Sequence, residues 1–284
     1  MDYDYKYAFL RFPDWKDKAL TLSYDDGSKF DLPMLEIMKK HGIKGTFNIN
    51  SGRFGEMEGD WHLTKEQAIK AYGQDGIEVA VHGSQHVMLE GYSTEQITYE
   101  ILSDRKTLED TFGKIVKGMA YAYGSVNDEI VSILEKCGIS YSRTVHSTER
   151  FNVPNDWLHL PATCHHNNPR LMELAKEFLE APQPEKWWYR KPKLFYLWGH
   201  SFEFDRDGNW DVFEKFAAYM GGRDNVWYAT NGEIYEYVKA YERLQYSVDG
   251  TMVYNPSALD VYIENEKGKY VVLAGKTAKL TKKI

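Results

Sequence analysis

Short runs of apolar and β-branched residues recur along the first 230 positions of the chain, and helical segments separate most of them. The runs lie at residues 19–24, 45–50, 77–81, 117–122, 139–145, 157–163, 194–199 and 225–230. Segments with a helical period lie at residues 32–42, 64–73, 93–113, 127–138 and 168–180. Several begin at a Ser, Thr or Asn cap and end at Gly, and Thr64–Gln67 and Ser93–Gln96 predict capping boxes. The pattern predicts eight strands that alternate with helices.

Strands that alternate with helices over about 240 residues predict parallel βα units, either closed as a barrel or wound as an open sheet. From about Tyr246 the pattern changes to short alternating runs, with a hairpin signal at residues 266–268. We therefore expect a βα barrel domain over residues 1–245 and a small β-rich extension over residues 246–284. The extension could cap the barrel, pair with another subunit or extend a binding surface.

Polar residues follow the predicted strands. In chain order they are Asp25 and Asp26, Asn50, His82, Tyr123 and Gly124, His146, His165 and His166, His200 and Asn231. The carboxyl ends of parallel strands share one face, where such folds carry their active sites. Histidines at four of these eight ends, together with the carboxylate pair, favour a catalytic rim over ordinary loop chemistry.

Composition and charge narrow the class of protein. The chain has 284 residues and 43% hydrophobic content, which suits one large α/β domain or two smaller ones. A net charge of −7 gives no electrostatic reason to expect nucleic acid or an anionic membrane as a partner. No apolar run approaches the ~20 residues of a membrane span, and the first residues do not resemble a signal peptide, so we expect a cytoplasmic protein. Cys137 and Cys164 have no metal-type spacing.

Aromatic residues make up 15% of the chain, and several cluster between residues 187 and 204. Aromatic faces suit sugar rings, but they also fill cores and subunit interfaces. Core or interface roles are favoured for the group, with a sugar-binding cleft as the alternative. A homo-oligomer could form through the aromatic-rich surface or through the C-terminal extension.

Two histidines and an aspartate pair carry the candidate chemistry. His82 and His86 are four residues apart directly after a strand, so one helical turn would put both rings on one face. A carboxylate from a neighbouring strand end would complete a facial metal site of two histidines and one carboxylate. If one aspartate of the pair Asp25 and Asp26 binds the metal, the other can act as a general base, with His200 as the acid. The alternatives are a simple Asp-Asp-Gly turn and unrelated surface histidines.

Four segments together resemble a known family. LTLSYDDG (20–27), VHGSQH (81–86), AYAYG (120–124) and LWGHS (197–201) are similar, in order and spacing, to the motifs of the polysaccharide deacetylases. These are the NodB-homology enzymes of carbohydrate esterase family four. The resemblance covers about residues 15–240. It implies a distorted (β/α) barrel of seven to eight parallel strands and the removal of N- or O-linked acetyl groups from sugars.

The resemblance also implies a role for each matching residue. Asp25 matches the catalytic base and His200 the general acid, while the backbone N–H of Tyr123 matches a group that binds the oxyanion. The residues that match the metal ligands are Asp26, His82 and His86. The implied cofactor is a divalent metal ion, most often zinc, with cobalt or manganese as alternatives.

Some positions depart from the family pattern. Ala120 stands where the family usually has an arginine that orients the base, and we expect Arg143, on the following strand, to take its place beside Asp25. Val153 replaces the first acid of an Asp-x-x-Asp-Trp motif, of which Asp156 and Trp157 remain. Gly83 and Ala122 also differ from the usual residues.

The sequence gives only weak indications of which residues contact the substrate. We expect Trp157, Arg143 and Trp198 to contact the substrate, with a place in the core or barrel wall as the alternative for the first two. His165 and His166 have no counterpart to which a role can be assigned.

Three functions fit these observations. The first is a metal-dependent hydrolase that removes acetyl groups from a saccharide or a related small amide or ester. The second is a cyclic amide or imide hydrolase of the allantoin type, and the third is a non-catalytic carbohydrate-binding protein. An intact Asp26, His82 and His86 set argues against metal-free members of the second class. Asp25 and His200 argue against the third, because binding alone needs neither a base nor an acid.

Overall fold

The structure is a computed structural model that describes residues 8–56, 61–181, 184 and 190–280. Its central strands are β2 (Lys18–Asp25), β3 (Gly45–Ile49), β4 (Ile77–Val81), β5 (Gly118–Ala120), β6 (Tyr141–Ser147), β7 (Leu160–Ala162), β8 (Cys164–His165), β9 (Lys193–Gly199) and β10 (Val226–Tyr228). Its helices include α1 (Asp31–Lys40), α2 (Lys65–Tyr72), α3 (Thr94–Phe112), α4 (Asp128–Lys136), α5 (Leu171–Glu180), α6 (Ser201–Arg206), α7 (Trp210–Met220) and α8 (Asn231–Glu242). Within these residues, no helix is both long and apolar enough to cross a membrane.

The central strands form one sheet in which all pairs of neighbours are parallel. The order is β7-β6-β5-β4-β3-β2-β9-β8, and β10 pairs with the first half of β2. The segment 160–165 closes this sheet, because β7 pairs with β6 and β8, after a single residue, pairs with β9. If β7 and β8 are counted as one interrupted strand, the ring has seven strands with β10 beside it. The expected distorted (β/α) barrel is confirmed.

Alternation along β2 explains how the barrel is filled. Leu20, Leu22 and Tyr24 face the helices and belong to the larger apolar core. The intervening positions, which end at Asp25, face the inside of the ring, where Thr21 donates a hydrogen bond to the Asn231 side chain at 2.8 Å. The interior of the barrel is therefore partly polar and leads to a carboxylate at the carboxyl end of β2.

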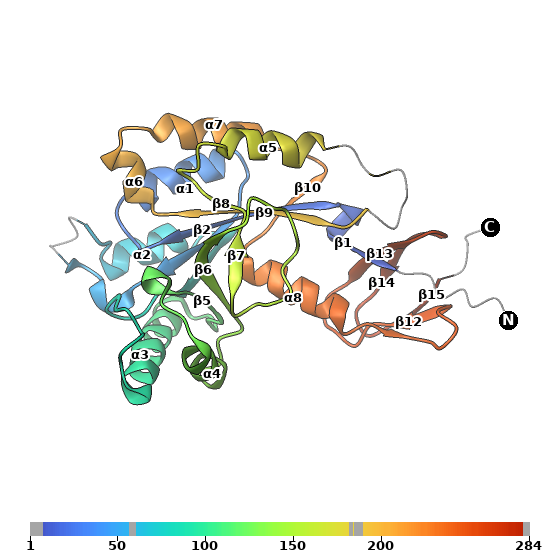
Figure 1. Cartoon of the computed structure of the whole chain (residues 1–284), viewed down its shortest axis with the longest axis horizontal. Helices are drawn as coiled ribbons and strands as arrows, with labels where there is room; N and C mark the ends of the chain where they lie inside the picture. The colour runs from blue at the N-terminus through green and yellow to red at the C-terminus, as the bar shows by residue number, and fades with distance from the viewer. Residues whose placement is uncertain (1–7, 57–60, 182–183, 185–189, 281–284) are drawn as a thin grey trace.

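Helices cover the outside of the ring in two groups. Figure 1 shows α1, α5, α6 and α7 together on one side and α3 and α4 on the other, with α2 between the two groups at the left. Helix α8 lies between the barrel and the small C-terminal sheets. Residues of α8 pack with residues from the amino ends of the strands in a second apolar cluster, so this helix covers the amino end of the barrel.

The C-terminal segment forms antiparallel strands, as its alternating pattern predicted. They are β11 (Gln245–Tyr246), β12 (Met252–Tyr254), β13 (Val261–Asn265), β14 (Gly268–Val272) and β15 (Thr277–Lys279). The hairpin predicted at residues 266–268 is confirmed between β13 and β14. β13 also pairs with β1 (Phe9–Arg11), so one of these sheets contains a strand from the start of the chain.

The predicted elements correspond closely to the observed ones. Both capping boxes form, with Thr64 and Ser93 each accepting a hydrogen bond from the backbone N–H three residues later. The one predicted strand at 157–163 is divided between β7 and β8, because its residues change partner from β6 to β9. In the aromatic-rich segment, Leu194, Tyr196 and Trp198 are core residues of β9, whereas residues 187–189 lie outside the described part of the chain.

Candidate active site

Asp25 is the last residue of β2, at the carboxyl end of the barrel, and only 2% of it is exposed. The Asn48 side chain, on the paired position of β3, donates a hydrogen bond to Asp25 Oδ1 at 2.8 Å. The Arg143 guanidinium, which is fully buried, forms an ion pair with Asp25 Oδ2. Both oxygens of the carboxylate are thus held by side chains from other strands.

The surroundings of Asp25 keep it ionised. Burial alone would raise the pKa of its carboxyl group. The positive charge and hydrogen bond of Arg143, together with His82 and His200, more than offset that effect and hold the pKa well below its usual range. Asp25 is therefore an anion at neutral pH, which is the state that can accept a proton.

Asp26, His82 and His86 bring their ligand atoms together beside Asp25. Asp26 Oδ1 lies 3.5 Å from His82 Nε2 and 3.3 Å from His86 Nε2. The three ligand atoms all lie within 4.8 Å of one another. Asp26 and His86 both have positive φ, at 79° and 55°, and these tight backbone bends direct the side chains toward the common point.

This set has the features of a metal centre. Ligand atoms about 2.0–2.1 Å from a tetrahedral ion are roughly 3.3 Å apart, which agrees with the two separations from Asp26. Asp26 Oδ1 is buried and has no hydrogen-bond partner among the described residues. His82 Nδ1 lies 2.8 Å from the Ala120 carbonyl, which can only accept, so the proton is on Nδ1 and the Nε2 lone pair is free. The residues fit a divalent cation.

Burial also sets the protonation state of the two histidines. It lowers the pKa of His82, and it lowers that of His86 to about 4, although the neighbouring aspartates oppose the change. Both rings are therefore neutral at pH 7, as metal ligands must be. Behind them, the Asp104 carboxylate accepts hydrogen bonds from the backbone N–H of His82 at 3.0 Å and of Ser51 at 2.8 Å.

His200 lies on the other side of Asp25. It follows β9 and precedes α6, and its Nε2 is 3.8 Å from Asp25 Oδ2. This distance is too long for a hydrogen bond, so the two groups face each other across a gap. A quarter of the His200 side chain is exposed, whereas that of Asp25 is almost completely covered. The carboxyl end of the barrel thus combines a buried anion, a possible cation site and an accessible histidine.

Comparisons with known proteins agree with this arrangement. The family described as "Polysaccharide deacetylase" matches residues 13–142. YxkH of Bacillus subtilis, a protein assigned to the polysaccharide deacetylases, is 28% identical over 123 residues, 43% of each chain. PgdA of Listeria monocytogenes, named a peptidoglycan-N-acetylglucosamine deacetylase, is 25% identical over 141 residues, which are 49% of this chain and 28% of PgdA. The resemblance to the polysaccharide deacetylases is confirmed. The matched segment spans less than half the length of either relative.

Solved structures show that the deacetylase fold extends beyond the matched segment. A Mycobacterium smegmatis protein assigned to the polysaccharide deacetylases superposes with a TM-score of 0.58 at 19% identity, over 84% of this chain and 95% of that one. A mutant of a Bacillus anthracis protein, described as a carbohydrate esterase family four pseudoenzyme, gives 0.51 at 18% identity, over 80% and 70% of the two chains. The same fold thus occurs in a protein described as a pseudoenzyme, so the fold alone does not define an activity.

The cation beside Asp25 comes from a different strand than the deacetylase pattern implies. Ala120, which stands at the usual arginine position, is paired in register with Arg143 on the neighbouring strand β6. The Arg143 guanidinium crosses to Asp25 and packs on the Trp198 ring, with its central carbon 4.3 Å from the ring centre. The expected pairing of Arg143 with Asp25 is confirmed. Arg143 is completely buried, and its contact with substrate stays a prediction.

The other two expected substrate contacts differ from each other. Trp198 is 8% exposed and lies within 6.0 Å of the His200 ring, so it borders the site. Trp157 lies at the opposite end of the barrel, because its carbonyl accepts a hydrogen bond from Ser142 at the start of β6. The Trp157 ring packs edge-on against Tyr235 of α8. This position places Trp157 away from Asp25, and its contact with substrate stays an untested prediction.

Four of the remaining strand-end residues lie in three different places. Tyr123 reaches the site, where its exposed ring packs on His86 with centres 4.5 Å apart. His165 and His166 lie near His200 and converge on Glu203, a residue that the sequence patterns did not indicate. Asn231 does not reach the rim, because β10 pairs only with the first half of β2 and ends inside the barrel.

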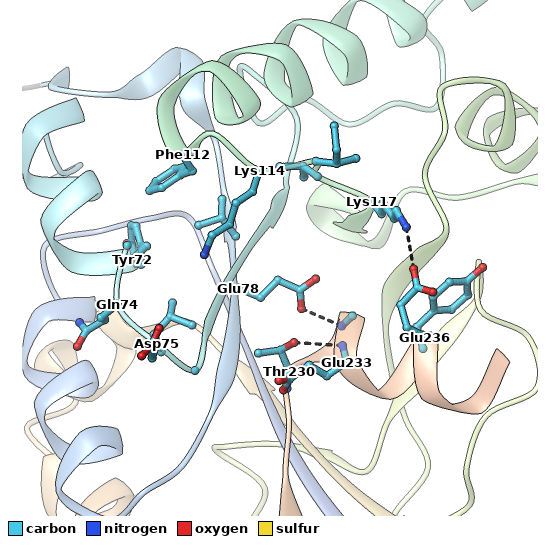
Figure 2. A pocket seen from close by; sticks show the side chains of 18 of the residues that line it. Tyr72, Gln74, Asp75, Glu78, Phe112, Lys114, Lys117, Thr230, Glu233 and Glu236 are labelled. Atoms are coloured by element: carbon cyan, nitrogen blue, oxygen red, sulfur yellow. Dashed lines mark hydrogen bonds and ion pairs between the residues drawn. The ribbon is translucent and has the colours of Figure 1, made fainter. Parts of the chain in front are cut away.

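A separate hollow of about 460 Å³ lies at the amino end of the barrel (Figure 2). Residues 72–79, 112–117 and parts of 230–236 line most of it, and none of these residues belongs to the Asp25 site. Its main carboxylate, Glu78, accepts hydrogen bonds from Gly232 N, Thr46 Oγ1 and Tyr141 OH at 2.7–2.8 Å. Lys117 pairs with Glu236 at 2.8 Å across its edge. Glu78 and Lys117 are thus each paired with other groups of the protein.

Proposed function

We propose that this protein is a metal-dependent deacetylase that hydrolyses N- or O-linked acetyl groups on a saccharide or a related small substrate. The observation that carries the proposal is the convergence of a three-ligand set with an ionised aspartate and a histidine at one end of the barrel. The similarity to YxkH, which is assigned to the polysaccharide deacetylases, and to PgdA, which is named a deacetylase, supports hydrolysis of acetyl groups as the reaction. This similarity does not define the substrate.

Asp26, His82 and His86 would hold the divalent cation, and zinc is the ion we expect because the set offers two imidazoles and one carboxylate. When bound, such an ion lowers the pKa of water and polarises a carbonyl. Cobalt and manganese are the alternatives that a test must include.

Asp25 is the general base in this proposal. Its carboxylate accepts the proton that the attacking water loses, and the hydrogen bond from Asn48 and the ion pair with Arg143 hold it in one orientation. Because these two partners are buried, the base needs little reorganisation during the reaction.

His200 is the general acid. Burial lowers its pKa, but the Glu203 carboxylate, Asp25 and Asp26 outweigh that effect and raise it above the usual value. A protonated ring can then donate from Nε2 to the leaving nitrogen or oxygen of the sugar, after which acetate is released. The backbone N–H of Tyr123 is proposed to stabilise the oxyanion that forms when water adds to the acetyl carbonyl.

The test combines metal analysis with acetate release. Purified protein is analysed for bound metal and assayed on N- and O-acetylated saccharides, as isolated, after chelation, and after addition of zinc, cobalt or manganese. We expect about one ion per chain, acetate release from at least one substrate, loss after chelation and recovery with metal. Absence of bound metal together with no acetate release from any substrate would overturn the proposal. Ring opening of a cyclic imide without acetate release would favour the allantoin-type alternative.

A further inference from the structure

Three histidines surround one carboxylate next to the candidate acid. Glu203 lies one helical turn after His200 on α6. Its Oε2 is 3.1 Å from His166 Nε2, 3.2 Å from His165 Nε2 and 3.6 Å from His200 Nδ1. The two consecutive histidines come from the segment that closes the barrel, so this carboxylate connects that segment to the active site.

The interior part of the cluster is deeply buried. His166 is 1% exposed, and its ring is stacked between Tyr24 and Phe204, with centres 5.7 and 4.1 Å away. His166 Nε2 and Glu203 Oε2 are buried atoms with no well-aligned hydrogen bond to other described residues. Burying polar atoms without a partner costs free energy of folding. Because the two atoms lie close to each other, we interpret them as partners in one interaction.

The protonation of His165 decides between a second metal site and a network of N–H donors. The backbone N–H of Asn167 donates to His165 Nδ1 at 3.1 Å, so the neutral ring carries its proton on Nε2. That proton faces Glu203 and leaves no lone pair there for a metal ion. The geometry therefore favours donation of N–H groups to the carboxylate.

We propose that Glu203 is a positioning residue for His200: it fixes the ring so that Nδ1–H faces the carboxylate and Nε2 faces the reacting groups, while His165 and His166 hold Glu203 in place. This inference rests on the proposed function, since it assigns His200 a partner for its role as acid.

The separation of 3.6 Å between His200 Nδ1 and Glu203 Oε2 is that of an ion pair, longer than a hydrogen bond. Catalytic hydrogen bonds are often long in proteins without substrate and shorten in the occupied site. A small rotation of the His200 ring, a quarter of which is exposed, would close this distance.

Several other charged or titratable groups also face His200 and its partner. Asp25 lies across the gap at 3.8 Å, Asp26 acts from further away, and the His165 ring centre is 6.1 Å from that of His200. Arg206 lies 3.6 Å from the other oxygen of Glu203, but more than half of its side chain is exposed. Loss of the Glu203 charge leaves the two aspartates in place, so His200 should remain titratable but lose its proton at lower pH.

The first measurement is the pH dependence of kcat and kcat/KM for Glu203→Gln. The matched control is Asp205→Asn, an exposed residue of the same helix that loses the same charge. We expect kcat to fall roughly 10- to 100-fold in Glu203→Gln and the alkaline limb to move to lower pH, with partial recovery in Glu203→Asp. The control should stay within about twofold of the original protein. Equal effects in Glu203→Gln and Asp205→Asn would overturn the proposal.

The second measurement does not depend on deacetylase activity. Ring ¹⁵N chemical shifts report the tautomer of each histidine, and a His200→Gln sample assigns the His200 signals. We expect His200 to carry its neutral proton on Nδ1 in the original protein and in Asp205→Asn, and to lose this preference in Glu203→Gln. An Nε2–H tautomer in the original protein would overturn the proposal, even if acetate release is demonstrated. Conversely, the expected tautomer with no acetate release would place the failure in the proposed function.

Metal analysis and a second variant complete the test. His166→Phe keeps a ring of similar size and removes one holder of Glu203, so we expect a smaller shift of the alkaline limb with bound metal unchanged at about one ion per chain. Two ions in the original protein and one in His166→Phe would identify the cluster as a metal centre and overturn the proposal.

Discussion

The two ends of the barrel hold carboxylates with opposite surroundings. At the amino end, Glu78 accepts three neutral hydrogen bonds, and burial raises its pKa. At the carboxyl end, Asp25 faces an arginine and two histidines, and its pKa is lowered despite burial. Its neighbour Asp26 retains a buried oxygen with no hydrogen-bond partner among the described residues.

This difference indicates that Glu78 has a structural role, whereas Asp25 is placed to take part in a reaction. A group whose hydrogen bonds are all satisfied by the protein has nothing left to offer a substrate or ion, whatever the size of the hollow beside it. The Asp25 end is distinguished by basic partners and by unused ligand atoms. The hollow at the amino end therefore gives less indication of chemistry than the Asp25 end does (Figure 2).

The largest expected difference between the ends concerns metal. His82→Ala should lose bound metal and all measurable acetate release while it remains folded, because one of three ligands is missing. Tyr141→Phe, which removes one hydrogen bond to Glu78 at the other end, should keep both metal and activity. Elemental analysis, circular dichroism and the acetate assay check this pair. Full metal occupancy in His82→Ala would remove His82 from the ligand set.

Loss of the proposed base, Asp25, should reduce activity nearly as much as loss of the metal. Asp25→Asn should reduce kcat about 10²- to 10⁴-fold with metal retained, because the amide cannot accept the proton from water. Glu78→Gln makes the equivalent change at the amino end, and there we expect activity within about threefold of the original. A similar loss of kcat in both variants would show that the two ends of the barrel do not differ in this respect and that Asp25 is not specifically the base.

Arg143 tests the electrostatic part of the comparison. Arg143→Met leaves the Asp25 charge buried without its cation, which should lower the free energy of unfolding by about 3–5 kcal/mol. Lys117→Met breaks an exposed pair at the amino end and should cost less than about 1 kcal/mol. Denaturant titration measures both.

Arg143→Met should also change the pH profile. Loss of the cation disfavours the Asp25 anion and raises its pKa, so the acid limb of kcat/KM should move to higher pH. In the double variant Asp25→Asn, Arg143→Met the stability loss should be smaller than the sum of the single losses. Additive losses would mean that the two side chains do not stabilise each other.

The smallest expected effect is on the pH dependence of stability. Burial raises the pKa of Glu78 in the folded protein above its value of about 4.3 in an unfolded chain. The folded state then binds more protons than the unfolded state above that value, so this group lowers stability as pH rises through the folded-state pKa. Glu78→Gln should therefore lose less melting temperature than the original protein as pH rises from about 4. An unchanged loss would indicate that Glu78 has an ordinary pKa.

Local patterns predicted the elements and most of the carboxyl-end site. The alternation that ends at Asp25 and the spacing of His82 and His86 follow from residues close in sequence, whereas Arg143 was expected because the deacetylase resemblance places an arginine at Ala120. These features depend on strand direction and on which side chains share a face, which a periodic pattern contains.

Register and long-range pairing account for the rest. Trp157 was expected at the site because it follows Asp156 in a familiar motif, but the chain enters β7 from the amino end of the barrel. Asn231 follows a strand, yet the register of β10 on β2 stops it short of the rim. For Glu203 there was a usable signal, because positions three apart on a helix share a face, and His200 immediately precedes α6.

The in-register pair of Ala120 and Arg143 has a consequence for how such sites change over time. Two adjacent strands can each deliver a long cationic side chain to the same point inside the barrel, provided that the other position is small. A lineage could therefore exchange the donor strand through an intermediate that carries neither arginine, without moving the carboxylate. Ala120→Arg combined with Arg143→Ala would reconstruct that exchange in the laboratory.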